Sequence, residues 1–317
     1  MIRAATRGSP LARWQTDHVV ALLAAAESGA LGASGPVAET VVISTEGDRR
    51  ADVPLAEIGG KGVFVKEVQA AVLDGRADVA VHSAKDLPAA TPDGLVIAAV
   101  LERADPRDAL VGARLADLPA GATVATGSQR RRVQLLALRP DLVIVGLRGN
   151  IATRLARLDT PPDGAQPVDA QAVGAQPVDA LVMAAAALHR LGLAHRADEL
   201  LDPETFVPQV GQGVIAVECR ADDAVTRAAL AHLDHAPTRA LLTVERGFLT
   251  ELGGDCDLPA GAHAHLGVGR LVVDGVLEVD GELRRARVEA TAEATADATV
   301  EAAAELGARL ARVLRDR

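Results

Sequence analysis

Short apolar segments alternate with helical patterns along most of this 317-residue chain, and this alternation restricts the possible folds more than any other feature. Chains that alternate in this way form parallel sheets with helices packed on their faces. A helix is expected to begin at Ser9-Pro10, where serine caps and proline occupies the first turn. The other elements predicted in the first hundred residues are strands over 2–6, 37–43, 78–82 and 95–100, and a helix over 63–73.

A second α/β set follows residues 103–107, which indicate a crossover between two domains. Strands are predicted over 122–125, 142–147 and 178–183, each followed by a helix. A strand over 214–220 and a helix to about 233 come next. We therefore expect two doubly wound α/β domains, the first made of residues 1–101 with 212–233 and the second of residues 106–207.

The remaining segment, residues 237–317, predicts a smaller α+β domain. It begins with a helix over 238–252. Residues 271–279 resemble a hairpin, with Asp274-Gly275 suited to its tight turn. A strand over 287–290 and a helix over 296–314 complete this expected C-terminal domain.

Composition excludes several classes of protein. The net charge of −10 and an aromatic content of 1% argue against nucleic-acid binding, which needs a basic face and stacking rings. The first residues lack the apolar core of a signal peptide, and the longest apolar run, 180–188, is too short to cross a bilayer. Two cysteines form neither a disulfide framework nor a metal cluster. A cytoplasmic monomer is expected, with no metal, membrane or nucleic-acid partner.

The chain has thirty arginines but only three lysines, Lys61, Lys66 and Lys85. Lysine is a compact charge whose pKa shifts readily, whereas arginine is a fixed planar fork. Lys85 follows an apolar strand and precedes Asp86, which indicates a site where the smaller ammonium is needed. A solvated Lys-Asp pair on a loop is the alternative.

Three junctions between a strand and a helix combine small residues with arginine. Free backbone N–H groups and the helix dipole make such junctions anion sites. Between Thr126 and Arg157 there are seven arginines and one acid, in an otherwise acidic chain. These features favour a small polyanion held between two α/β domains, with ordinary helix capping or a solvated basic face as alternatives. The junctions are Thr6-Arg7-Gly8-Ser9, Thr126-Gly127-Ser128 before Arg130-Arg131-Arg132, and Leu147-Arg148-Gly149-Asn150 before Arg154.

Cys256 lies in a segment rich in glycine and proline, which predicts an exposed loop. Cys219 falls inside a predicted strand and is expected to be buried and inert. The neighbouring acids Asp255 and Asp257 raise the pKa of the Cys256 thiol by like-charge repulsion. This setting fits a thiol that is modified once and then kept, and an incidental cysteine is the alternative.

These motifs occur together, and in the same order, in one known family. The chain resembles the porphobilinogen deaminases, also called hydroxymethylbilane synthases, from the first strand to the Cys256 loop and more weakly to its end. The segments that carry the resemblance are Ala5-Thr-Arg-Gly-Ser-Pro10, Gly59-Gly-Lys-Gly-Val-Phe64, His82-Ser-Ala-Lys-Asp-Leu-Pro88, Asp105-Pro-Arg-Asp108, Leu147-Arg-Gly-Asn150, Val210-Gly-Gln-Gly213 and the Cys256 loop.

The resemblance implies two domains like the halves of a type II periplasmic binding protein, plus a C-terminal domain that carries the cysteine. It implies an enzyme of tetrapyrrole (haem) biosynthesis that joins four porphobilinogen molecules head to tail, releases ammonia at each step and frees hydroxymethylbilane by hydrolysis. It also implies a dipyrromethane cofactor attached through a thioether to Cys256.

Asp86 is implied as the catalytic carboxylate. The groups implied to bind the carboxylates of substrate and cofactor are Arg7, Ser9, Lys61, Ser83, Lys85, Thr126, Ser128, Arg130, Arg131, Arg148, Arg154, Arg190 and Gln212. The chain departs from the family at three positions. Asp255 precedes the cysteine where glycine is usual, Gly127 replaces a common serine, and Glu57 stands where a lysine is often found.

Two other functions fit part of the pattern. A non-catalytic, two-lobed binder of a small polycarboxylate would share the fold and the arginines, but it would explain neither the C-terminal domain nor Cys256. An enzyme that forms a Schiff base on Lys85 is a further alternative. It is disfavoured because Asp86 is expected to keep the lysine charged.

Overall fold

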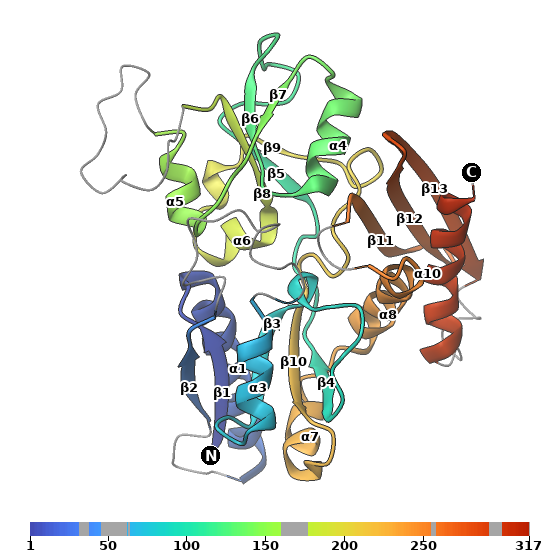
Figure 1. Ribbon diagram of the computed structural model, residues 1–317. Helices are drawn as coiled ribbons and strands as arrows, with labels where there is room; N and C mark the ends of the chain where they lie inside the picture. The colour runs from blue at the N-terminus through green and yellow to red at the C-terminus, as the bar shows by residue number, and fades with distance from the viewer. Residues whose placement is uncertain are drawn as a thin grey trace.

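The computed structural model contains three β-sheets, two of five strands and one of three. It describes residues 1–31, 38–45, 62, 64–159, 177–254, 258–291 and 300–316. Figure 1 shows the two larger sheets one above the other, with the three-stranded sheet and its helices beside them. This arrangement confirms the expected fold class of two α/β units and a C-terminal α+β unit. Among the helices described, none combines the length and apolarity that a bilayer crossing requires.

The first unit contains a sheet in the order β2-β1-β3-β10-β4. Strands β2, β1 and β3 are parallel, whereas β10 runs antiparallel to both β3 and β4. Parallel strands end at the same edge, so the residues after β1 and β3 lie close together. Its elements are β1 Ile2–Arg7, α1 Pro10–Leu31, β2 Ala38–Ile43, α3 Lys66–Leu73, β3 Val79–Ser83, the short 3₁₀ helix η2 Ala84–Asp86, β4 Leu95–Val100, β10 Ile215–Arg220 and α7 Ala224–Ala231.

The second unit interrupts the first, because the chain leaves after β4 and returns as β10 (Figure 1). Its sheet has the order β7-β6-β8-β5-β9. Strand β5, which heads this unit directly after the crossover, was not predicted because an acid and an arginine precede a run of only three apolar residues. Its elements are β5 Asp108–Val111, β6 Thr123–Ala125, α4 Gln129–Leu138, β7 Val143–Val145, α5 Ile151–Ala156, β8 Ala180–Ala184, α6 Ala185–Arg190, η3 Ala194–Arg196 and β9 Glu199–Leu200.

The C-terminal unit is an antiparallel sheet of three strands packed against two helices. The elements are α8 Ala236–Glu251, β11 Ala260–Gly267, β12 Arg270–Val279, β13 Glu282–Thr291 and α10 Val300–Arg315. The helices cross closely at two glycines. A Cβ on Gly307 would lie 1.9 Å from the Val244 carbonyl oxygen, and one on Gly247 would lie 2.1 Å from that of Ala304.

The predicted hairpin turn at Asp274-Gly275 is wrong, because both residues lie within the continuous strand β12. Asp274 accepts a hydrogen bond from the Nε of Arg287 on β13, at 2.7 Å. Gly275 is required by packing, since a Cβ there would lie 2.6 Å from Leu310 of α10. A turn lies instead at Asp280-Gly281, where both residues have positive φ angles of 52° and 84°.

The buried face of α1 is not the one that its most apolar repeat would favour. Leu11, Trp14, His18 and Leu22 recur at helical spacing, yet Trp14 is 36% exposed and stacks on His18. The buried face is displaced by one position and consists of Gln15, Thr16, Val19 and Leu23. Its polar residues tolerate burial because their side chains are hydrogen-bonded, as to Ser83 and to the Ala12 carbonyl.

Candidate active site

A cleft of about 1130 Å³ lies between the first and second units. Ligands in open α/β sheets bind at the carboxyl ends of strands, and the cleft lies at these ends in both sheets. Residues after β1 and β3 form one wall, and residues after β6 and β7 form the other. The predicted site residues that line it are Arg7, Ser9, Ser83, Lys85, Asp86, Thr126, Ser128, Arg130, Arg131, Arg148, Arg154 and Gln212.

Side-chain caps shape the three predicted junctions. The Ser9 hydroxyl accepts a hydrogen bond from the Ala12 N–H at 3.3 Å, and the Ser128 hydroxyl accepts one from Arg131 at 3.4 Å. Asn150 caps α5 in the same way, through the Thr153 N–H at 3.0 Å. The predicted capping is therefore present, and it places the basic side chains that follow at the cleft.

Asp86 and Lys85 lie in η2, directly after β3, and both line the cleft. Within the part of the chain that the structure describes, neither side chain has a hydrogen bond or an ion pair with another residue. A carboxylate and an ammonium group are thus both available to a ligand. Leu87, which follows them, is 2% exposed and anchors the segment in a buried cluster with Val100 and Leu242.

Burial lowers the pKa of Lys85 from its ordinary value of 10.5 to about 8. Although one face of the side chain borders the cleft, the surrounding protein buries the ammonium group. Repulsion from the guanidinium of Arg131 lowers the pKa further. Asp86 acts in the opposite direction and is outweighed. With a pKa of about 8, the ammonium form of Lys85 still predominates at pH 7.

Arg148 and Arg154 add two cations to the second wall. Burial lowers the pKa of both guanidinium groups, that of Arg154 to about 10, and repulsion from Arg131 contributes at Arg154. Among the described residues, neither has a carboxylate partner, and the buried Nε of Arg148 has no hydrogen-bond partner. Anions bound here would relieve this uncompensated positive charge, so the cleft is built for a ligand with several carboxylates.

Arg130 and Arg131 differ from these cations because they are already paired. Both bind the fully buried carboxylate of Asp108, at 2.8 Å and 2.7 Å. Arg130 also donates to the Val207 carbonyl, and Arg131 to the Val182 carbonyl. Burial alone would raise the pKa of Asp108, but the two guanidinium groups outweigh it and hold the pKa below its usual value.

Gln212 belongs to the segment that returns from the second unit to the first, and Arg190 contacts that segment. The amide nitrogen of Gln212 donates to the Pro106 carbonyl at 2.8 Å and to Asp108 at 3.0 Å. Arg190 donates to the Gly213 carbonyl at 2.7 Å and its guanidinium lies 5.8 Å from the Trp14 ring centre. Arg190 is not among the described residues that line the cleft. Lys61 and Cys256, like Glu57 and Asp255, lie outside the described residues.

Three residues at the site were not assigned a role from the sequence. Gln15 of α1 exchanges hydrogen bonds with Ser83, at 2.8 and 3.2 Å. Phe64, quoted only as the end of a motif, lies under the guanidinium of Arg7, whose carbon is 4.0 Å from the ring centre. Asp108 was quoted in a motif without a function. The sequence feature that could have identified it is an acid at the start of a short apolar strand, in a chain where Arg130 and Arg131 are adjacent.

Packing explains the glycine at position 127. A Cβ on Gly127 would lie 2.6 Å from the Leu147 carbonyl oxygen. We expect Gly127→Ser to lower the free energy of unfolding by roughly 1–3 kcal/mol, because the backbone before Arg148 must move. Urea denaturation measures this change. Gly146→Ala is the matched control, since the space around Gly146 is open. Equal stability of the two variants would contradict the prediction.

Comparison with known protein families gives two matches that together span most of the chain. Residues 2–228 match the family model described as porphobilinogen deaminase, dipyromethane cofactor binding domain. Residues 240–316 match the model described as porphobilinogen deaminase, C-terminal domain.

Curated relatives carry the same name. A porphobilinogen deaminase of Nitratidesulfovibrio vulgaris (strain Miyazaki F) is 44% identical over 90% of this chain and 83% of its own length. Another, from the Hildenborough strain, is 47% identical over 82% of this chain and 77% of its own. Among solved structures, YhfZ from Shigella flexneri matches 74% of this chain and 89% of its own at 18% identity, with a TM-score of 0.35, too low to assign a shared fold.

Proposed function

The chain belongs to the porphobilinogen deaminase family, and from this premise we propose that it joins four porphobilinogen molecules head to tail to give hydroxymethylbilane. Each addition breaks the C–N bond of one aminomethyl group, releases ammonia and forms a C–C bond to the next pyrrole ring, which loses a proton. Hydrolysis then frees the linear tetrapyrrole. The observation that carries the proposal is that Lys85, Arg148 and Arg154 line the cleft together with Asp86 and have no carboxylate partner among the described residues.

The substrate matches these cations, because every porphobilinogen unit contributes an acetate and a propionate. Lys85, Arg148 and Arg154 hold these carboxylates, and the hydroxyls of Ser9 and Ser128 add polar contacts. Arg130 and Arg131 shape the wall through Asp108. Asp86 accepts a hydrogen bond from a pyrrole N–H and stabilises the positive charge that develops as ammonia leaves.

The dipyrromethane cofactor fits the same wall, since its carboxylates would pair with the cations that lack partners there, including the orphaned Nε of Arg148. When bound, it supplies the pyrrole end to which the first substrate is joined. We propose Cys256 as its attachment point. Gly261, only five residues further along, packs against Arg130 beside the cleft, where a Cβ would lie 2.7 Å from Arg130 Cδ. Five residues span up to about 17 Å, enough to reach the cleft.

Thiol counting combined with intact mass tests the attachment. Cys219 is buried in β10, and burial raises its pKa to about 11, so in the folded protein it stays unreactive. We expect one reactive thiol in cofactor-free protein. After loading we expect none, with a mass gain of two porphobilinogen units less two ammonia. Cys256→Ser removes both signals and Cys219→Ser removes neither; an adduct lost only in Cys219→Ser would refute the assignment. Formation of hydroxymethylbilane from porphobilinogen is the parallel test of the activity.

The pH behaviour of Lys85 gives a test that does not depend on turnover. With only three lysines, selective labelling gives an NMR spectrum in which each side chain can be titrated. In cofactor-free protein, we expect one lysine to titrate near pH 8, below which it is charged. Loading should raise that midpoint, because bound carboxylates favour the ammonium form. Lys85→Arg identifies the signal by removing it; a midpoint near 10.5 in the empty protein would contradict the prediction.

The proposal extends to a monomeric cytoplasmic enzyme whose domains span 1–101 with 212–233, 106–207 and 237–317. The chain leaves and re-enters the first sheet near two of these boundaries, which supports the division. Light scattering on the purified protein tests the monomer.

A further inference from the structure

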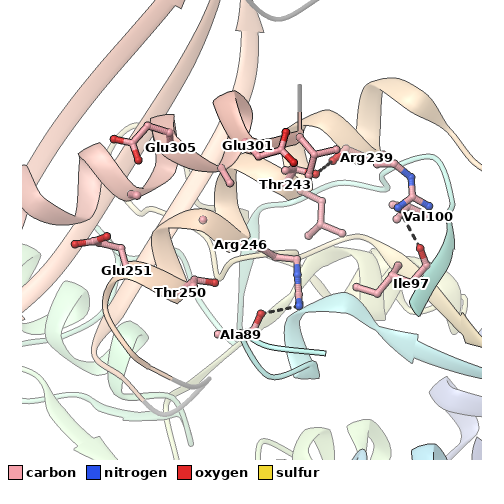
Figure 2. Close-up of a pocket in the computed structure, with 15 residues that line it drawn as sticks. Ala89, Ile97, Val100, Arg239, Thr243, Arg246, Thr250, Glu251, Glu301 and Glu305 are labelled. Carbon is pink, nitrogen blue, oxygen red and sulfur yellow. Dashed lines mark hydrogen bonds between the residues drawn. The ribbon is translucent and has the colours of Figure 1, made fainter. Parts of the chain in front are cut away.

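A second cavity, of about 520 Å³, lies between the first unit and the C-terminal unit. Figure 2 shows its walls, which are formed by α8 and the beginning of α10 on one side and by β4 and Ala89 on the other. Of the described residues, none lines both this cavity and the cleft. The cavity is therefore a separate site, on the other side of the segment that carries Asp86.

The cavity combines an apolar wall with one available cation. Ile97 supplies apolar surface and packs against the buried cluster that contains Val100 and Leu242. Arg246 of α8 enters from the side, and burial lowers the pKa of its guanidinium. In the described part of the chain, Arg246 has no carboxylate within ion-pair distance. The other lining arginine, Arg239, is already paired with Asp234 at 2.7 Å.

The cavity is linked to the catalytic segment by a hydrogen bond and by packing. Arg246 Nη2 donates to the carbonyl of Ala89 at 2.8 Å, as Figure 2 shows, and Ala89 is the third residue after Asp86. Val100 and Leu242, which line the cavity, belong to the same buried cluster as Leu87. A ligand that contacts Arg246 and Ile97 therefore contacts one residue that binds Ala89 and one that packs against the cluster of Leu87.

We propose that this cavity is an effector site for a small molecule with one carboxylate and an apolar body. A carboxylate forms a charge-assisted pair with Arg246 that is stronger than its bond to the neutral Ala89 carbonyl. Glu301 and Glu305 line the opposite rim, where the described lining residues include no cation, so the second carboxylate of porphobilinogen would find no charged partner there. Occupation releases Ala89 from Arg246 and lowers kcat. This regulation goes beyond the proposed function.

Binding of 2-naphthoate to the complete, cofactor-loaded protein tests the site. Isothermal titration should show an affinity about tenfold weaker in Arg246→Gln, because the charged partner is lost. Arg309→Gln is the matched control. Arg309 lies on α10 outside the cavity lining and makes one long hydrogen bond, of 3.4 Å, to the Glu289 carbonyl, so its loss should leave the affinity unchanged. Unchanged binding in Arg246→Gln, or equal weakening in both variants, would overturn the proposal.

A second variant keeps the proposal testable if Arg246→Gln fails to fold. Thr243→Phe fills the cavity but keeps the guanidinium, and it should also abolish naphthoate binding. Circular dichroism of each variant verifies its fold. In the kinetic arm, naphthoate should lower kcat at least about twofold in the parent protein and not in Arg246→Gln. Competitive inhibition that persists in Arg246→Gln would place the ligand in the cleft and refute the inference. The binding result stands whether or not the chain proves to be a deaminase.

Discussion

Asp86→Asn is expected to lower kcat at least about 100-fold, the scale of effect seen when a catalytic acid–base or charge-stabilising group is removed. Asparagine keeps the size of the side chain but cannot balance the positive charge that develops on the substrate as ammonia leaves. In the described part of the chain, the Asp86 carboxylate has no hydrogen bond or ion pair to lose. Folding should therefore be preserved, and single-turnover kinetics should show the loss in the chemical step.

Asp93→Asn is the matched control, because Asp93 is an exposed acid between the same two strands and does not line the cleft. It should retain the parent rate. Substrate carboxylates would still find Lys85, Arg148 and Arg154 in Asp86→Asn, so KM should change much less than kcat. A near-normal kcat in Asp86→Asn would remove Asp86 from the mechanism.

The positions of the site residues along the fold could be predicted from local pattern. Strand ends, caps and arginines at the three junctions are properties of short segments, and parallel strands bring such ends together whatever their order. The cleft lining at Arg7, Lys85, Ser128 and Arg148 follows from this rule. The family motifs added Asp86, whose role the alternation of strands and helices does not reveal.

What could not be predicted depends on contacts between segments far apart in the chain. Asp274-Gly275 has the composition of a turn, and only the approach of Leu310 shows why a glycine is needed within a strand. The pairing of Arg130 and Arg131 with the buried carboxylate of Asp108 is another contact of this kind. The lowered pKa of Lys85 could not be predicted either, because it results from burial by several elements of the fold.

The largest expected effect on stability comes from Asp108→Asn. Asp108 is fully buried and is the only carboxylate within ion-pair distance of Arg130 and Arg131 among the described residues. Removing its charge leaves two buried guanidinium groups uncompensated, which typically costs about 3–5 kcal/mol. The variant should therefore unfold at a clearly lower urea concentration than the parent protein.

The pH dependence of stability gives a second test of the Asp108 ion pairs. Because the folded pKa of Asp108 lies below its ordinary value of 3.8, its contribution is complete above that value and is lost only as pH falls through the lower folded pKa. The stability gap between the parent and Asp108→Asn should thus be full at pH 7 and narrow in strong acid. Asp141→Asn, which breaks an exposed pair with Arg139, is the control and should change stability little.

The same carboxylate also joins the two crossovers, because Gln212 of the returning segment donates to Asp108 at the start of β5. Loss of the charge should therefore loosen the first unit against the second as well as destabilise the second unit. Hydrogen exchange should increase at both 106–112 and 209–214 in Asp108→Asn, and at neither in Asp141→Asn. A variant as stable as the parent, with unchanged exchange in both segments, would show that Arg130 and Arg131 do not need this partner.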